Sequence, residues 1–438
     1  HCIIPDNGME KHCVIVEGNP DFQFNIPPMK GAGRNGSPYF TDLSSLDPAT
    51  EFFAIGPKKL FDETVAYANY RNSTGQPAVA IDADELYAQF GFGVPKHPLG
   101  IRNFSKWVTA TMDEPKHLFL IGKAIANDVI RKDPAMNAQV LMPSFGVPPT
   151  DLWYTAYEMN NGTEEPSLAV GRLAAQTGAQ VSAYLQKVME FESTGPALWK
   201  KKGLHFSGGG SSSEATAIRN MLDSYKDLFE DTLIGGNVQT FQKTTSEPFQ
   251  ITQVDSIENL INTGVQLVTF FGHGSSVGFD VSIDHPSTFQ NVDGRYPVML
   301  GLSCFAGDIH QAPGIGSISE NWVLEPDGGA LAFIATIGPG NRQYLNNYFT
   351  KWYQNLSQDD YGRSIGQVMK HTIFENSQLS NDVTTIHNLG NTLHGDPSLI
   401  LTSSVLPDIK TSVPEVYTIP GELTTLLDSF QLNIVMSN

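Results

Sequence analysis

Residues 267–274 read LVTFFGHG, and residues 298–304 read VMLGLSC. Each begins as an unbroken apolar run of the length typical of a buried β-strand, and each ends in small or polar residues. Further runs of this kind alternate with amphipathic segments along the chain, which indicates a mostly parallel sheet flanked by helices. In such sheets, ligands and catalytic groups gather beyond the carboxyl ends of the strands. His273 and Cys304 therefore stand where chemistry is expected.

The alternation of strands and helices occurs twice, which predicts an α/β fold with two subdomains. The first series has the strand-like runs FFAIG (52–56), PAVAID (77–82), HLFLIG (117–122) and SLAVGRL (167–173). The second series starts after Trp199 with GLHFSGGG (203–210) and closes with GDPSLILTS (395–403). We predict a first subdomain at residues 52–198 and a catalytic subdomain at residues 199–404, packed edge to edge.

The two ends of the chain differ from this body. Residues 1–51 are rich in Gly, Pro and Asn, which predicts an arm with little power to fold alone. Residues 405–438 alternate apolar and polar side chains, which predicts the start of an immunoglobulin-like β domain that the chain does not complete. The chain begins at His1, without an initiator Met. We expect it to be a processed part of a longer polypeptide.

The composition favours a folded, acidic protein. Hydrophobic residues make up 40% of the chain and charged residues 17%, which is enough apolar material for a sizeable core. Lys and Arg total 27 against 46 Asp and Glu, for a formal charge of −19. An acidic surface repels phosphate backbones, so no nucleic acid partner is expected. No apolar run reaches the ~20 residues that span a bilayer, so no transmembrane segment is expected either.

The three cysteines fall into two groups. Cys2 and Cys13 lie close together near the N-terminus and could close a small disulfide loop, as fits an oxidising compartment. Cys304 is then left as a free thiol. A single unpaired Cys in a chain that also offers candidate bases is a candidate nucleophile.

His273 and Cys304 have the surroundings that acyl transfer requires. If their two strands are neighbours, both side chains project from the same edge of the sheet, and the adjoining glycines let backbone N–H groups approach a substrate carbonyl. The N–H groups of Gly274 and Cys304 are the candidates for an oxyanion hole. A buried Cys is often only a small apolar residue, and a His beside Gly is often structural. From these residues alone, the catalytic and structural interpretations both stay open.

Four stretches of the chain resemble the gingipain family of cysteine peptidases, which share a caspase-like fold. GHGSSVGF (272–279) and SCFAGD (303–308) are similar to the segments around the family's catalytic histidine and cysteine. LAVGRLAAQTGAQVSAYLQKVMEFE (168–192) resembles the family's strand, Gly-Arg and helix unit between the subdomains, and LHGDPSLIL (393–401) resembles its closing strand. The resemblance extends over residues 52–402.

The resemblance implies a secreted or cell-surface cysteine endopeptidase of a bacterium that cleaves protein or peptide substrates through a thioester. It implies a dyad of Cys304 and His273, with no cofactor required for the chemistry. The family places an acidic residue against the catalytic histidine, and Asp151 is the candidate by position. Asp151 could equally be a turn residue or a calcium ligand. Phe279, the aromatic residue at the end of the histidine segment, is a candidate for substrate contact.

The resemblance also suggests charged sites. Glu158, Glu164 and Glu165 could form an acidic pocket for a basic substrate side chain, or only a solvated loop. Members of the family bind calcium, so structural calcium is an expectation here too. The sequence has no EF-hand loop, so the ligands cannot be named. The family often has an acidic residue where this chain has Lys123, which argues against a cation site at that position.

Two other functions fit the same resemblance. The family includes the sortase of the type IX secretion system, a transpeptidase that removes C-terminal signals. Residues 85–108 (ELYAQFGFGVPKHPLGIRNFSKWV) resemble that branch as much as the digestive one. Such a protein would have secretion components of the outer membrane as partners. The third alternative is a non-catalytic scaffold of a secretion complex, against which the presence of both His273 and Cys304 argues.

Overall fold

One continuous sheet joins the two halves of the chain. The computed structural model describes residues 40–156, 165–231, 233–243, 251–281, 283, 285–378, 381–401, 416–419 and 431–434. Within them, ten strands lie side by side in the order β2-β1-β3-β4-β12-β11-β10-β7-β5-β6. They are β1 (Phe52–Gly56), β2 (Ala78–Asp82), β3 (His117–Ile121), β4 (Ala169–Leu173), β5 (Lys202–Ser207), β6 (Asn237–Gln242), β7 (Leu267–Phe271), β10 (Val298–Leu302), β11 (Ala332–Thr336) and β12 (Asn391–His394).

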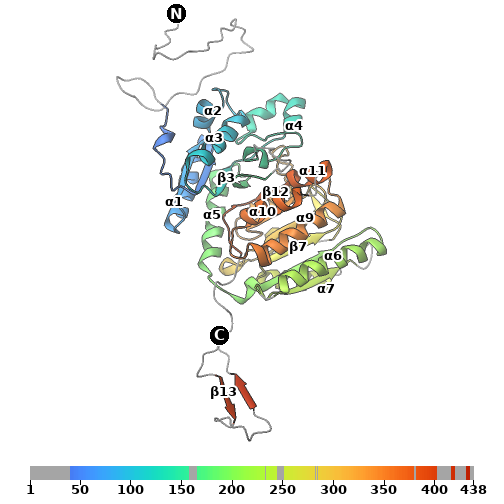
Figure 1. Ribbon diagram of the computed structural model, residues 1–438. Helices are drawn as coiled ribbons and strands as arrows, with labels where there is room; N and C mark the ends of the chain where they lie inside the picture. Colours follow the sequence, from blue (N-terminus) through green and yellow to red (C-terminus); the bar gives the residue numbers. More distant parts are fainter. Residues whose placement is uncertain are drawn as a thin grey trace, which may run out of the picture.

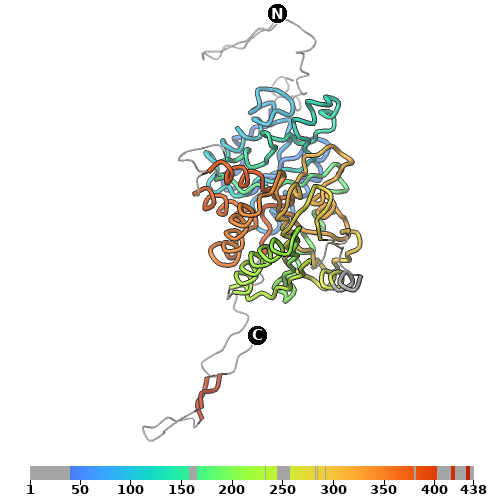
Figure 2. The backbone as a smooth tube through the Cα atoms, turned by 90° about the vertical axis from the view of Figure 1, so that its right-hand side faces the viewer, coloured from blue at the N-terminus to red at the C-terminus, as the bar shows by residue number. Residues whose placement is uncertain are grey.

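Helices flank this sheet, as Figure 1 shows. They are α1 (Phe61–Ser73), α2 (Ala83–Phe90), α3 (Pro98–Thr111), α4 (Asn127–Lys132), α5 (Gly178–Ser193), α6 (Ser212–Glu230), α7 (Ile251–Thr263), α8 (Ile318–Val323), α9 (Arg342–Gln354), α10 (Ile365–Ser377) and α11 (Asp382–Gly390). In both Figure 1 and Figure 2, residues 40–156, in blue to teal, form the upper part of the body. The predicted α/β fold, a mostly parallel sheet flanked by helices, is confirmed.

The strand β12 lies where the two halves meet. Strands β1 to β4 pair in parallel with one another, as do β5, β6, β7, β10 and β11. Strand β12 runs antiparallel to β11 and touches β4 through a bridge between His394 and Arg172. The sheet is therefore shared by both predicted subdomains, and the boundary between residues 198 and 199 stays a prediction.

Both faces of the sheet are buried, which explains why its strands read as unbroken apolar runs. In β1, Phe52 and Ala54 belong to a core cluster that extends under both halves of the sheet. Phe53 and Ile55 alternate with them and belong to a second cluster, confined to the first half. Successive side chains of a strand point to opposite faces, so most positions of a strand that is covered on both sides are apolar. The few buried polar residues, such as Arg172 of β4, have hydrogen-bond partners in the interior.

The Gly-Arg motif and the Gly-Asp-Pro motif contact each other at this junction. A Cβ atom added to Gly171 would lie 2.3 Å from the carbonyl oxygen of Gly395 and 2.8 Å from Cδ of Pro397. A larger residue at 171 would therefore push the two segments apart. Gly171 lets β4 approach the chain that follows β12.

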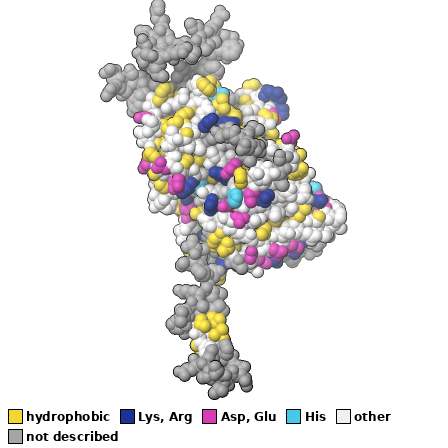
Figure 3. Space-filling model, viewed as in Figure 1, with side chains coloured by type: hydrophobic (Ala, Val, Ile, Leu, Met, Phe, Trp, Pro, Cys, Tyr) yellow, Lys and Arg dark blue, Asp and Glu magenta, His cyan; other side chains and the backbone are white. Residues whose placement is uncertain are grey.

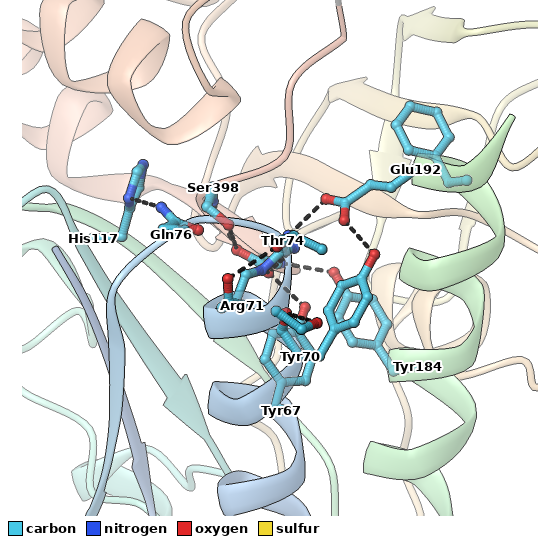
Figure 4. Close-up of polar contacts among 12 residues, drawn as sticks. Tyr67, Tyr70, Arg71, Thr74, Gln76, His117, Tyr184, Glu192 and Ser398 are labelled. Carbon is cyan, nitrogen blue, oxygen red and sulfur yellow. Dashed lines mark hydrogen bonds and ion pairs between the residues drawn. The ribbon is translucent and has the colours of Figure 1, made fainter. Parts of the chain in front are cut away.

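Asp396 anchors a buried polar network that ties α1 to this junction (Figure 4). Its carboxylate accepts hydrogen bonds from the Tyr67 hydroxyl at 2.5 Å and from Nε of Arg71 at 3.0 Å. The Arg71 guanidinium also donates to Glu192 of α5 at 2.7 Å, and the Asp396 N–H donates to the Tyr184 hydroxyl at 2.7 Å. The motif thus joins α1, α5 and the end of β12.

The closing strand is shorter than predicted. Strand β12 covers Asn391–His394, whereas the resemblance placed a strand at 393–401. The chain turns at Gly395, where φ is +138°, and Asp396 then accepts the Ser398 N–H at 2.7 Å. After His394 the chain therefore forms a turn, stabilised by the Asp396 carboxylate, and no longer pairs as a strand. Helices α2, α7, α8 and α11 are further elements that the sequence patterns did not single out.

The ends of the chain are described only in part. Two short strands, β13 (Val416–Ile419) and β14 (Gln431–Ile434), pair antiparallel within the segment predicted as an immunoglobulin-like start. Most of the predicted N-terminal arm, including Cys2 and Cys13, lies outside the described residues. The disulfide and the immunoglobulin-like domain both stay predictions.

The surface carries charges of both signs. On the face shown in Figure 3, acidic and basic side chains are interspersed near the middle of the body, and acidic ones continue along its lower edge.

In the described part of the chain, no helix is long and apolar enough to cross a membrane.

Candidate active site

Four neighbouring parallel strands end at one edge of the sheet and supply the groups of the candidate site. Ser207 of β5 is paired with Phe271 of β7, which is paired with Leu302 of β10. His273 and Cys304 each stand two residues beyond their strand, so adjacent strand ends present the imidazole and the thiol. The predicted arrangement of these two strands is therefore what the structure shows.

The carboxylate that contacts His273 belongs to Glu214. The distance from Nε2 of His273 to Oε2 of Glu214 is 3.0 Å. The Gly210 N–H also donates to this oxygen, at 2.9 Å, and Arg342 lies 3.6 Å from the other oxygen. The Gly210 N–H, followed by the His273 imidazole and Arg342, holds the pKa of the Glu214 carboxyl below its ordinary value. Glu214 is therefore an ionised acceptor that fixes the proton of His273 on Nε2.

The glycine-rich turn after β5 explains how Glu214 reaches the histidine. Ser211 caps α6 by accepting the Glu214 N–H at 3.3 Å, so Glu214 stands in the first turn of that helix. The Gly209 N–H donates to Asp280 at 2.9 Å, and a Cβ atom on Gly208 would lie 2.2 Å from the same carboxylate. Asp280 thus pins the turn to the loop that carries His273.

Cys304 is half-buried, and its sulfur contacts the segment that follows β11. The Gly340 N–H donates to Sγ at 3.3 Å. The next residue, Phe305, adopts a positive φ of 58° and donates its N–H to Gly338 at 2.9 Å. No hydrogen bond links Sγ to the imidazole in the part of the chain that the structure describes, because the ring bonds to Glu214 and the thiol to Gly340.

Two backbone N–H groups of the candidate site, one in Cys304 and one in the residue after His273, have no acceptor within the described residues. Asp280 donates its N–H to the His273 carbonyl at 2.9 Å in the small hairpin of β8 (Gly274–Ser275) and β9 (Gly278–Phe279). This makes Gly274 and Phe279 a non-hydrogen-bonded pair, so the ladder leaves the Gly274 N–H free. The Cys304 N–H likewise has no acceptor among the described residues. These are the two groups that the sequence nominated for an oxyanion hole.

Phe279 belongs to this hairpin, and its ring packs onto the sheet. Its ring stacks on Phe270 of β7 with a centroid distance of 3.9 Å, and it is half-buried. A Cβ atom on Gly274 would lie 3.1 Å from the ring and 2.7 Å from the Ser303 hydroxyl. The ring thus supports the loop under Gly274, and its contact with substrate stays a prediction.

Asp151 is paired with Arg172, whereas the carboxylate that contacts His273 is that of Glu214. The two oxygens of Asp151 accept hydrogen bonds from Nε and Nη2 of Arg172, at 2.8 and 2.7 Å, and both side chains are almost fully buried. Although burial raises the pKa of Asp151, Arg172 and then His310 outweigh it and hold this pKa well below its usual range. The expectation that Asp151 lies against His273 is corrected: Arg172 points into the interior and requires a carboxylate there.

The three candidate acids for a basic substrate pocket receive little support. Glu158 and Glu164 lie outside the described residues. Glu165 lies 3.8 Å from Lys370 of α10 and does not line the cavity beside Cys304. The pocket that they were proposed to form stays a prediction.

Glu214 is the residue of the candidate site that the sequence patterns missed. The segment SGGGSSSEA (207–215) forms the turn after β5 and the start of α6. The available signal was the position of an acidic residue in the first helical turn after a strand, combined with His273 on another strand. Only the strand order, with β5 beside β7, shows that the two residues meet.

Metal ligands are not assembled in the described residues. No group of three or more His, Cys, Asp or Glu side chains there could hold a metal ion. The Lys123 ammonium is buried and contacts Glu320 at 2.5 Å and the Ile309 carbonyl at 3.1 Å. A cation supplied by the chain thus occupies this position, and structural calcium elsewhere stays a prediction.

The comparisons with known proteins agree with the fold. The model of peptidase family C25 matches residues 45–402. The fold is similar to the crystal structure of the Arg-specific cysteine proteinase gingipain R, with a TM-score of 0.63, 16% identity, and coverage of 84% of this chain and 82% of that chain. It is also similar to the complex of Porphyromonas gingivalis RgpB pro- and mature domains, with a TM-score of 0.62, 16% identity and 83% of each chain covered. No curated protein matches the chain in sequence.

Proposed function

Because this chain belongs to peptidase family C25, a family of cysteine peptidases, we propose that it is an endopeptidase in which Cys304 is the nucleophile and His273 the base. The observation that supports the proposal is that Cys304 and His273 follow two adjacent strands, and that Glu214, on the helix after the next strand, contacts His273. A thiol, an imidazole and a carboxylate in this order are the parts of a cysteine peptidase.

The chemistry divides among these residues as follows. Glu214 accepts a hydrogen bond from Nε2–H of His273, which leaves Nδ1 as the nitrogen that takes the thiol proton of Cys304. The thiolate attacks the peptide carbonyl, and the tetrahedral oxyanion is stabilised by the N–H groups of Gly274 and Cys304. Removal of one such donor in comparable enzymes costs about 3–4 kcal/mol of transition-state stabilisation.

The two later steps return the protons. The His273 imidazolium gives its Nδ1 proton to the leaving amine as the C–N bond breaks, and a thioester on Cys304 remains. A water molecule then attacks the thioester, gives its proton to His273, and releases the carboxylate product and the thiolate. The absence of a Cys304–His273 hydrogen bond is consistent with this scheme, since such contacts often tighten only when substrate binds.

We also propose that the protein acts at the outer surface of a bacterium or outside it. The resemblance of residues 52–402 to the gingipains supports this location. The acidic chain, with its formal charge of −19, is compatible with it.

The experiment combines labelling with turnover. The chain is treated with iodoacetamide and, separately, incubated with a protein substrate, in the wild type and in Cys304→Ala and His273→Ala. We expect thiol labelling at Cys304 and cleavage that both substitutions abolish. His371→Ala removes another half-exposed histidine, which pairs with Asp360 at 2.8 Å, and should keep full activity.

Two outcomes would favour the alternative functions. Transfer of the acyl group to an added amine, in preference to water, would indicate a transpeptidase of the sortase type. A Cys304 that is no more reactive than a free thiol, together with no cleavage of any substrate, would indicate a scaffold and overturn the proposal.

A further inference from the structure

A cavity of about 630 Å³ lies beside Cys304. Its wall includes Phe305, the residue after the nucleophile, and Pro339, the residue before the Gly340 N–H that contacts the sulfur. The segment 337–340 follows β11, which borders β10 on the side opposite to β7. The sulfur therefore lies between the histidine loop on one side and this cavity on the other.

Large apolar side chains surround the cavity and reach solvent. Val147, Phe305, Ile315 and Ile386 line it with exposed fractions of 80, 39, 58 and 53%. One exposed apolar residue needs no explanation, but four around a concavity that adjoins a nucleophile mark a site for an apolar ligand. Phe305 is held in this position by a positive φ, an uncommon conformation for a bulky residue.

The carboxylates of the cavity already have partners. Asp308 accepts hydrogen bonds from the Gln311 side chain at 2.9 Å and from the His310 N–H at 3.3 Å. Asp128 pairs with Lys132 on the surface, at 3.2 Å. A basic side chain entering the cavity would have to compete with these partners for a carboxylate. An apolar side chain needs none.

His310 belongs to this wall, and its ring is buried behind the surface of the cavity. Its side chain is buried, and neither ring nitrogen has a hydrogen-bond partner among the described residues. Its Nε2 atom lies 4.0 Å from Asp151, beyond hydrogen-bond distance. A buried polar group without a partner costs about 1–3 kcal/mol.

We propose that this cavity is a subsite for a large apolar side chain of the substrate, in a residue that adjoins the scissile bond. The inference rests on the proposed peptidase function and adds the substrate class to it. Leu, Met, Phe and similar side chains fit a cavity of this size and lining. The proposal contradicts the basic specificity that Glu158, Glu164 and Glu165 suggested.

A digest of a random peptide library tests the proposal. The residues on both sides of every cleaved bond are identified by mass spectrometry. We expect large apolar side chains to be enriched by at least about tenfold at one fixed position next to the cleaved bond, the discrimination that an apolar pocket can supply. Enrichment of basic or acidic residues there, or no enrichment at either position, would overturn the proposal.

Two variants connect the preference to the cavity. Ala312→Trp fills the cavity from a half-buried lining position, and Ile315→Asp places a charge at its exposed rim without filling buried space. Both should reduce the cleavage of apolar substrates by about tenfold or more. Leu198→Trp changes an exposed residue before the start of β5, at the other end of the strands, and should leave the preference intact. An unchanged preference in both cavity variants would contradict the proposal.

Binding to Cys304→Ala separates this proposal from the proposed function. Fluorescence anisotropy compares a labelled peptide rich in Leu and Phe with one in which Arg replaces those residues. Tighter binding of the apolar peptide, lost in the double variant with Ile315→Asp, supports the subsite even if the wild type cleaves nothing. Equal binding of the two peptides would overturn the subsite, whatever the fate of the peptidase proposal.

Discussion

The Nε2 atom of His273 lies 3.0 Å from the Oε2 atom of Glu214, although 59 positions separate the two residues in the chain. The contact exists because β5 and β7 are neighbours. His273 stands two residues after β7, and Glu214 lies in the first turn of α6, the helix that follows β5. In the proposed mechanism, this contact leaves Nδ1 of His273 for the thiol proton and fixes the tautomer of the general base.

Glu214→Gln tests this role. The substitution keeps the size of the side chain and removes the charge that stabilises the imidazolium. General acid–base catalysis contributes about 100- to 10,000-fold, and we expect loss of the orienting charge to lower kcat/KM by about 10- to 100-fold with little change in stability. Asp223→Asn removes a carboxylate from the exposed face of the same helix, where it pairs with Arg219, and should change neither quantity. Equal activity of Glu214→Gln and wild type would remove Glu214 from the mechanism.

Asp151→Asn should behave in the opposite way. It leaves the buried Arg172 guanidinium without its counter-ion, which costs about 3–5 kcal/mol in comparable sites. Urea denaturation should show this loss, while kcat per folded molecule stays close to that of the wild type. A fall in kcat as large as that of Glu214→Gln, at unchanged stability, would restore Asp151 to the catalytic machinery.

The Asp396 network should contribute strongly to the stability of the junction. Asp396→Ala removes the acceptor of Tyr67 and Arg71, and we expect a loss of about 3–5 kcal/mol in the free energy of unfolding. Tyr67→Phe deletes one hydrogen bond and should cost about 1 kcal/mol. The exposed pair of Lys132 and Asp128 supplies the control, because Lys132→Ala should cost less than about 1 kcal/mol. Thermal denaturation of all three variants checks this order.

Three buried histidines predict a loss of stability in acid. Burial lowers the pKa of His117, His205 and His394 from the ordinary 6.5 to about 3. Below pH 6.5 the unfolded chain takes up protons that the folded chain excludes. Their contribution is therefore fully present above pH 6.5 and is lost as the pH falls toward 3, by about 1.4 kcal/mol per group for each pH unit.

Urea denaturation between pH 7.5 and 5 measures this slope. We expect the free energy of unfolding to fall with decreasing pH. His205→Gln removes one of the three groups and should reduce the slope below pH 6.5 by about 1.4 kcal/mol per pH unit. Lys132→Ala, at an exposed position, should keep the wild-type slope. A free energy of unfolding that is independent of pH over this range would show that the three rings are accessible to protons in the folded state.

Much of the fold was readable from local patterns. Runs such as LVTFF and VMLGL indicate strands covered on both faces, and their alternation with amphipathic segments indicates a parallel sheet. The Gly-Arg and Gly-Asp-Pro motifs were visible as motifs only. Their meaning depends on the contact of Gly171 with Gly395, two residues that are distant in the chain.

The candidate site, like the fold, could be predicted from the sequence only in part. Cys304 and His273 stand directly after strand-like runs, so their place at the sheet edge followed from the sequence. The roles of Asp151 and Glu214 did not, because an isolated carboxylate has no local pattern that names its partner. Asp151 pairs with the buried Arg172 guanidinium. The order of the strands brings a different carboxylate, that of Glu214, to His273.

The amino-acid sequence by itself determined which segments become buried strands and which reactive side chains follow them. An unbroken apolar run forms a buried strand, and the residues that come next in the chain lie at the carboxyl end of that strand. Only the tertiary structure decided which carboxylate meets the imidazole, which cavity adjoins the thiol, and which glycines touch. Those relationships depend on strand order and close packing, and both bring together residues that no local pattern connects.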